Sequence, residues 1–189
     1  MRKFIVILVV LFLAATLPSR SQSRWAVSTN GVDWLQLATI NAELSYNFAT
    51  HWTVHVQGKY NPWTWKSSAP NEEHVQYRQA GVGVGLRYWF WQAYSGFFIS
   101  PQVDWKAYNR GGLFNDETTY EGNLYYFTPS GGYSLMLNSR FNLDFGLGLG
   151  IGINDYTKYA CPKCGKVLDK GKKLYIEPNN VLVQLTMLF

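Results

Sequence analysis

Residues 141–155 read FNLDFGLGLGIGIND, a stretch that alternates strictly between two kinds of side chain. The odd positions are apolar from Phe141 to Ile153, whereas the even positions hold only glycine, asparagine and aspartate. Successive side chains of a β-strand point to opposite faces, so a period of two predicts a strand. This strand has one long apolar face and one face of small or polar residues.

The same alternation recurs in four other segments, at 40–48, 52–61, 80–90 and 97–108. It is less clean at 124–137, and at 25–37 the phase is ambiguous, which we interpret as a strand with a bulge. Most runs are close to the ~9–11 residues with which a tilted strand crosses a bilayer. Because charged and amide side chains keep to one face, we expect the apolar face to contact lipid and the polar face to line a barrel.

The connections between these segments alternate in length along the chain. Three are short, near 49–51, 91–95 and 138–140. Three are long and polar, at 64–74, 109–122 and 157–173. Outer-membrane barrels have short periplasmic turns and longer external loops. With a first connection near 38–40, the pattern predicts an all-β fold, an eight-stranded antiparallel transmembrane β-barrel.

The first 23 residues have the layout of a secretory signal peptide, with Arg2 and Lys3 before an apolar run at 4–15. An uncleaved anchor is the alternative, but that run is shorter than the ~20 residues of a spanning helix. We expect residues 1–23 to be cleaved and residues 24–189 to form a single barrel domain. Its expected location is the outer membrane of a Gram-negative bacterium, with the loops extracellular.

Composition supports a membrane barrel, because aromatic residues make up 17% of the chain and charged residues only 15%. Aromatic side chains form girdles at both interfaces of such barrels. A soluble lipocalin-like barrel is the alternative. The formal net charge of +5 falls to +2 without the leader, which holds three of the 17 lysines and arginines against 12 acids in the rest. This small surplus gives no reason to expect nucleic acid as a partner.

Seven ionisable side chains lie on the predicted inward faces, namely Glu43, His55, Lys59, Arg87, Asp104, Lys106 and Asp144. An eight-stranded barrel has an interior just wide enough for side chains, and buried charges need partners. We therefore interpret the seven as a polar network that plugs the lumen and prevents conduction. Glycines at alternate positions of 81–85 and 146–152 would make room for larger neighbours such as Lys59, Arg87 and Trp89.

A catalytic interpretation of the lumen rests on His55, the one histidine on a predicted inward face. Beside inward-facing acids it could serve an outer-membrane enzyme that modifies lipid. No nucleophile can be aligned with it from the sequence, so we assign no catalytic residue and expect a role other than catalysis.

The only two cysteines, Cys161 and Cys164, lie in the segment YACPKCGKVLDKGKKLY at 159–175. The pattern C-P-x-C-G resembles one knuckle of a zinc ribbon, but a structural zinc takes four ligands, and His74 is the only further candidate. A disulfide that closes a small turn suits an exported protein. We expect a disulfide before a zinc site at this pair and no other cofactor; free or redox-active thiols are a third alternative.

The same segment is rich in lysines, which are Lys158, Lys163, Lys166, Lys170, Lys172 and Lys173. They indicate either a contact with lipopolysaccharide phosphates or an acidic partner, or a merely solvated loop. Another aromatic segment, YNPWTW at 60–65, places Pro62 at the end of a strand and two tryptophans behind it. These tryptophans are typical of membrane-interface anchors, and a sugar-binding platform is the alternative.

The chain ends in VLVQLTMLF, an alternating strand with the terminal aromatic residue Phe189. This ending resembles the targeting signal of outer-membrane barrels. Together with YNPWTW, CPKCGK and the leader, it resembles a family of uncharacterised outer-membrane proteins of anaerobic gut bacteria, a domain of unknown function, over residues 24–189. The architecture is also similar to small OmpA-type barrels. The resemblance implies an eight-stranded barrel and brings no catalytic residues.

From these patterns we expect a structural or surface-interaction protein that acts through its extracellular loops. Expected partners are outer-membrane lipid and lipopolysaccharide, and a surface or fimbrial protein. The resemblance also implies an alternative, an accessory role in the assembly of surface appendages. Two further functions are compatible with the sequence, a lipid-modifying enzyme and a narrow channel.

Overall fold

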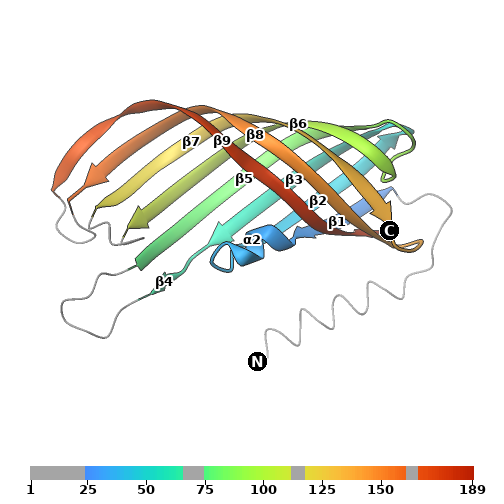
Figure 1. Cartoon of the computed structure of the whole chain (residues 1–189), viewed down its shortest axis with the longest axis horizontal. Helices are drawn as coiled ribbons and strands as arrows, with labels where there is room; N and C mark the ends of the chain where they lie inside the picture. Colours follow the sequence, from blue (N-terminus) through green and yellow to red (C-terminus); the bar gives the residue numbers. More distant parts are fainter. Residues whose placement is uncertain (1–23, 66–74, 112–117, 161–165) are drawn as a thin grey trace.

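The computed structural model describes residues 24–65, 75–111, 118–160 and 166–189, and nearly all of them lie in strands. The strands form one antiparallel sheet with the order β3-β2-β1-β9-β8-β7-β6-β5-β4, and an additional pairing of β3 with β5 closes it into a ring (Figure 1). The two-residue strand β4 (Thr64–Trp65) pairs only with β5, at its start. The closed wall therefore has eight strands, which confirms the predicted fold class.

The remaining elements follow the chain as β1 (Trp25–Asn30), α2 (Gly31–Leu35), β2 (Ile40–Ala49), β3 (Trp52–Asn61), β5 (Val75–Trp89), β6 (Gly96–Gly111), β7 (Thr119–Met136), β8 (Phe141–Tyr159) and β9 (Val167–Leu188). One end of the barrel, the turn end, has the tight connections at 50–51, 90–95 and 137–140, as predicted. The opposite end, the loop end, carries α2 and the other connections. None of the described helical segments is long and apolar enough to cross a membrane.

The ambiguous segment 25–37 is not a bulged strand, and the connection expected near 38–40 begins earlier, because residues 31–39 link β1 to β2. Strand β1 ends at Asn30, whose side chain accepts a hydrogen bond from the Val32 backbone and caps helix α2. The side chain of Asn41 then takes the place of the next backbone partner of β1. Its Oδ1 accepts a hydrogen bond from Asn30 N (2.6 Å), and its Nδ2 donates one to Asn30 O (2.9 Å). Two asparagines thus terminate the strand and start the helix.

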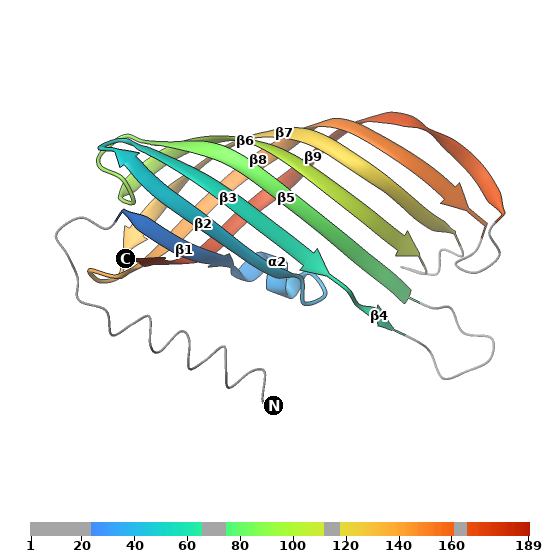
Figure 2. The ribbon, with the colours of Figure 1, turned by 180° about the vertical axis from the view of Figure 1, so that it is seen from behind.

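The loops expected at 109–122 and 157–173 are too long. Strand β6 continues to Gly111, β7 starts at Thr119, and β8 and β9 remain paired as far as Tyr159 and Val167. Polar cross-strand pairs hold these extensions together, such as Lys158 opposite Asp169. Strands β1 to β3 are much shorter, so the loop end has a low wall on their side and a high wall on the side of β8 and β9 (Figure 2).

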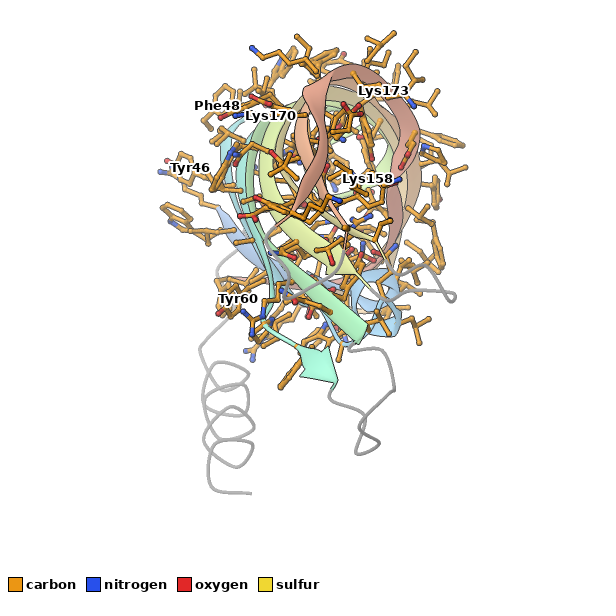
Figure 3. All side chains as sticks on the ribbon, turned by 90° about the vertical axis from the view of Figure 1, so that its left-hand side faces the viewer. Tyr46, Phe48, Tyr60, Lys158, Lys170 and Lys173 are labelled. Atoms are coloured by element: carbon orange, nitrogen blue, oxygen red, sulfur yellow. The ribbon has the colours of Figure 1, made fainter. Side chains whose placement is uncertain are left out.

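Side chains alternate between the inside and the outside of the ring. In β8, Asp144 is 1% exposed whereas Leu147 is 68% exposed. Seen along the barrel, Tyr46, Phe48 and Tyr60 lie on its outer surface, and other side chains fill the ring (Figure 3). The buried apolar cluster, Ala26, Trp89, Tyr94, Phe98 and Leu182, lies inside at the turn end. The rest of the buried interior is mostly polar.

The inward glycines make room for a different set of neighbours from those expected. A Cβ built on Gly85 would lie 2.6 Å from the His55 ring and 2.8 Å from the Pro101 carbonyl oxygen. A Cβ on Gly83 would meet the side chains of Asp104 and Gln102. The glycines of β5 therefore admit these three polar side chains, rather than Lys59, Arg87 and Trp89, into the narrow lumen.

We predict that Gly85→Ala destabilises the barrel by about 1–3 kcal/mol, because a backbone oxygen as well as the histidine ring must move. The matched control is Gly58→Ala on the neighbouring strand β3, where a Cβ meets nothing within 4 Å. Urea titration of the refolded protein in detergent, followed by tryptophan fluorescence, measures both. Equal free energies of unfolding for the two variants would contradict the prediction.

Candidate functional site: the polar lumen

A buried ion pair crosses the lumen near the turn end. The Arg87 guanidinium donates to the Glu43 carboxylate at 3.1 Å, and both side chains are almost completely buried. The cation also lies over the rings of Trp89 and Phe98, 5.6 and 4.7 Å from their centroids. Carboxylate and aromatic faces together replace the water that the guanidinium loses on burial.

A second buried group centres on Asp104 of β6. Its carboxylate accepts hydrogen bonds from Gln57 (3.2 Å), from Thr128 (2.9 Å) and from Gln102. The amide nitrogen of Gln102 points to Asp104. The amide oxygen of Gln102 therefore accepts a hydrogen bond from His55 Nε2 at 3.0 Å. His55 is therefore linked to the acid through an amide, which holds the imidazole in place but supplies no nucleophile.

The third buried acid, Asp144, is satisfied by hydroxyl groups. Ser134 and Thr186 donate to its two oxygens at 2.5 and 2.8 Å. Next to it, Asn142 donates to the Tyr94 carbonyl at 2.6 Å. With the ion pair and the Asp104 group, these contacts fill the turn-end half of the lumen with fixed, mutually bonded side chains. We call this half the plug.

Above the plug, at the loop end, the lumen opens into a polar cavity of ≈ 190 Å³, here called the outer cavity. Its charged and phenolic walls include Asp33, Lys59, Lys106, Arg110, Tyr175 and Glu177. Helix α2 supplies Asp33, which forms an ion pair with Lys59 at 2.9 Å. The helix thus completes the polar wall on the side where β1 to β3 are short.

A second hollow of ≈ 550 Å³, the mouth hollow, adjoins the outer cavity and shares Tyr175 and Glu177 with it. It is lined by the high wall of the barrel, where Lys158 lies over the Tyr120 ring at 5.2 Å. The Tyr156 hydroxyl donates to Asp169 at 2.8 Å. This hydrogen bond raises the pKa of the Tyr156 phenol, because deprotonation would remove the bond and then put two negative charges side by side.

The structure arranges the seven lumen residues named from the sequence as follows. Glu43 pairs with Arg87, His55 reaches Asp104 through Gln102, and Asp144 accepts hydrogen bonds from Ser134 and Thr186. Lys59 and Lys106 line the outer cavity.

The outer cavity wall includes residues that sequence reasoning missed, among them Asp33, Arg110, Tyr175 and Glu177. The alternation of β6 continues to Arg110 and could have identified it. Glu177 could not be found in this way, because the pairing of β8 with β9 shifts register between Gly148 and Leu149 and inverts the phase of β9. Asp33 sits three residues after Asn30, a helix-start signal inside the segment that periodicity assigns to a strand.

The cysteine pair Cys161 and Cys164, and the additional candidate ligand His74, lie outside the described residues. So does Lys163, whereas Lys170, Lys172 and Lys173 lie on strand β9 and not in a loop. Within the described ranges, no three histidine, cysteine or acidic side chains gather in a way that could hold a metal ion.

A family model described as a protein of unknown function, DUF3575, matches residues 5–189, so the chain belongs to that family. This agrees with the expected membership in an uncharacterised barrel family. A search of curated proteins and a search of solved structures each found no match.

We predict that Arg87→Met lowers the free energy of unfolding by about 3–5 kcal/mol, because it leaves the Glu43 carboxylate buried without its counter-charge. The double variant Glu43→Gln/Arg87→Met should regain part of this loss. Denaturant titration measures both, with Lys172→Met on an exposed position of β9 as the control. If the single and double variants were equally unstable, the pair would not be the cause.

Proposed function

We propose that the barrel spans the outer membrane and serves there as a structural or surface-interaction protein, presenting the loop end outside the cell. The observation that carries this proposal is the outer surface of the ring. Large apolar side chains are exposed on every strand of the closed wall, including Val103 at 64% and Leu147 at 68%. A soluble protein rarely exposes such a continuous apolar surface.

The apolar surface ends along one row of cross-strand partners. Trp105, Tyr125, Ile153 and Leu174 are consecutive partners across β6, β7, β8 and β9. The next outward row toward the loop end reads Ala107, Asn123, Asp155 and Lys172. Strands β2 and β3 have 10 residues each, about the length that crosses a bilayer, and the longer strands continue beyond this row.

Aromatic side chains collect near both borders of this surface. At the turn end, Trp25 packs on Tyr46 with ring centroids 4.6 Å apart, and Trp52 packs on Tyr88 at 4.9 Å. Toward the loop end, Tyr60, Trp63, Trp105 and Tyr125 are exposed. Two such belts are typical of barrels whose outer surface meets two membrane interfaces.

The plug favours binding over transport or catalysis as the role of this barrel. Its side chains bond one another across the lumen, so conduction would require several buried polar contacts to break. His55 faces an amide instead of a nucleophile. The high wall and the loops beyond it are then the parts that can meet partners, which would be lipopolysaccharide, a surface protein or a component of surface appendages.

We predict that Val103→Arg weakens insertion into lipid vesicles by about 2–4 kcal/mol, because it places a charge on the apolar surface. Asn123→Arg, beyond the polar border on the adjacent strand β7, should have little effect. Equilibrium folding into vesicles, read as the heat-resistant band on electrophoresis, compares the two. Equal insertion of both variants would remove the support for a membrane-spanning surface.

The surface role is tested by replacing residues 112–117 with a short glycine-serine linker in the native host. The barrel should still fold and fractionate with the outer membrane. Binding of the cells to surfaces coated with lipopolysaccharide or with proteins of the host's own cell surface should fall. Unchanged membrane integrity and unchanged surface binding after replacement of each loop in turn would contradict an interaction role.

A further inference from the structure

We propose that the outer cavity is a binding site for a small ligand that carries an oxyanion, a phosphate or a carboxylate, held by Lys106 and Arg110. The inference goes beyond the proposed surface role. It depends on the interior of the loop end and not on the location of the barrel, so either proposal can fail alone.

The acids of the outer cavity already have partners. Asp33 is bound to Lys59, Asp104 accepts three hydrogen bonds from the plug, and Glu177 accepts one from Tyr175. Among the residues that the structure describes, none forms an ion pair with Lys106 or Arg110. Lys106 and Arg110 share the cavity wall with a third cation, Lys59, and with the acids Asp33, Asp104 and Glu177. Without an ion pair of their own in this described part of the chain, Lys106 and Arg110 are available to pair with an added anion.

Arg110 lies against two tyrosine rings and has a hydrogen-bond donor without a partner in the described structure. Tyr77 and Tyr108 lie against it, with ring centroids 4.9 and 5.4 Å from its central carbon. The Tyr108 ring is itself fixed, because its hydroxyl donates to Asn154 at 2.8 Å. Arg110 Nε is buried and has no hydrogen-bond partner in the described structure. The aromatic rings accept no charge-assisted hydrogen bond, so the N–H groups remain for a planar or tetrahedral oxyanion, which arginine binds with two parallel hydrogen bonds.

The shape of the loop end suits a small anion. The outer cavity, at ≈ 190 Å³, is many times the ~10–15 Å³ that one water needs, yet too small for a polymer. The plug closes it below. The mouth hollow adjoins it, and Lys158 and Lys173 line that hollow together with Asp169 and Glu177.

The test uses the full mature chain, purified in a neutral detergent at low salt. Inorganic phosphate, acetate and glucose 1-phosphate are titrated by calorimetry, which separates a free phosphate from a carboxylate and from a phosphate on a carrier. At least one should bind, and Lys106→Gln and Arg110→Gln should each weaken that binding by about tenfold or more. Lys170→Gln, on an exposed position of β9, should bind as the unsubstituted chain does.

Folding of each variant is checked by its heat-resistant band on electrophoresis, so that loss of binding is not confused with loss of the barrel. Two results would overturn the inference. One is the absence of binding for all three probes at millimolar concentration. The other is binding that Lys106→Gln and Arg110→Gln leave unchanged, since the anion would then sit elsewhere.

Discussion

The narrow bore of an eight-stranded ring is the constraint on which the rest of this structure depends. In the turn-end half of this bore the inward side chains are not solvated, so each charge there needs partners among its neighbours. Arg87 meets Glu43 and two aromatic faces, and Asp104 and Asp144 are surrounded by donors. Gly83 and Gly85 lie directly beside Asp104 and His55 on the paired strands and leave space for these side chains. Hydrogen-bonded polar side chains thus fill the interior in the way that apolar side chains fill the core of a soluble protein.

The fold could be predicted because the alternation of apolar and polar side chains is visible within each strand. It can be identified without knowing which other strands pair with that strand. The strand from Phe141 to Ile153 and the tight turns near 49–51 and 138–140 follow correctly on that basis. Strand β1 does not, because Asn30 and Asn41 end it through bonds between side chain and backbone across two strands. Such a contact depends on register, which periodicity does not contain.

The lumen could be predicted as a set of residues but not as an arrangement. The odd and even positions of the alternating pattern identify which side chains face inward. They do not show that Gln102 lies between His55 and Asp104. The shift near Gly148 moves Tyr175 and Glu177 onto the inner face, and Pro178, which lies at the shift, is the kind of residue that marks such an irregularity in a strand. Charge-rich composition at the ends of β8 and β9 is typical of a loop, although cross-strand pairs such as Lys158 and Asp169 keep it in the sheet.

The unequal strand lengths give the barrel a front and a back. Across the ring, β3 with 10 residues faces β8 with 19, and β2 with 10 residues faces β7 with 18. On the side of β1 to β3 helix α2 continues the wall above the short strands, whereas on the other side the strands themselves extend beyond it (Figure 2). A neighbouring molecule therefore meets a different height of wall on each side of the barrel. The contact between two copies that lie side by side would depend on which sides face each other.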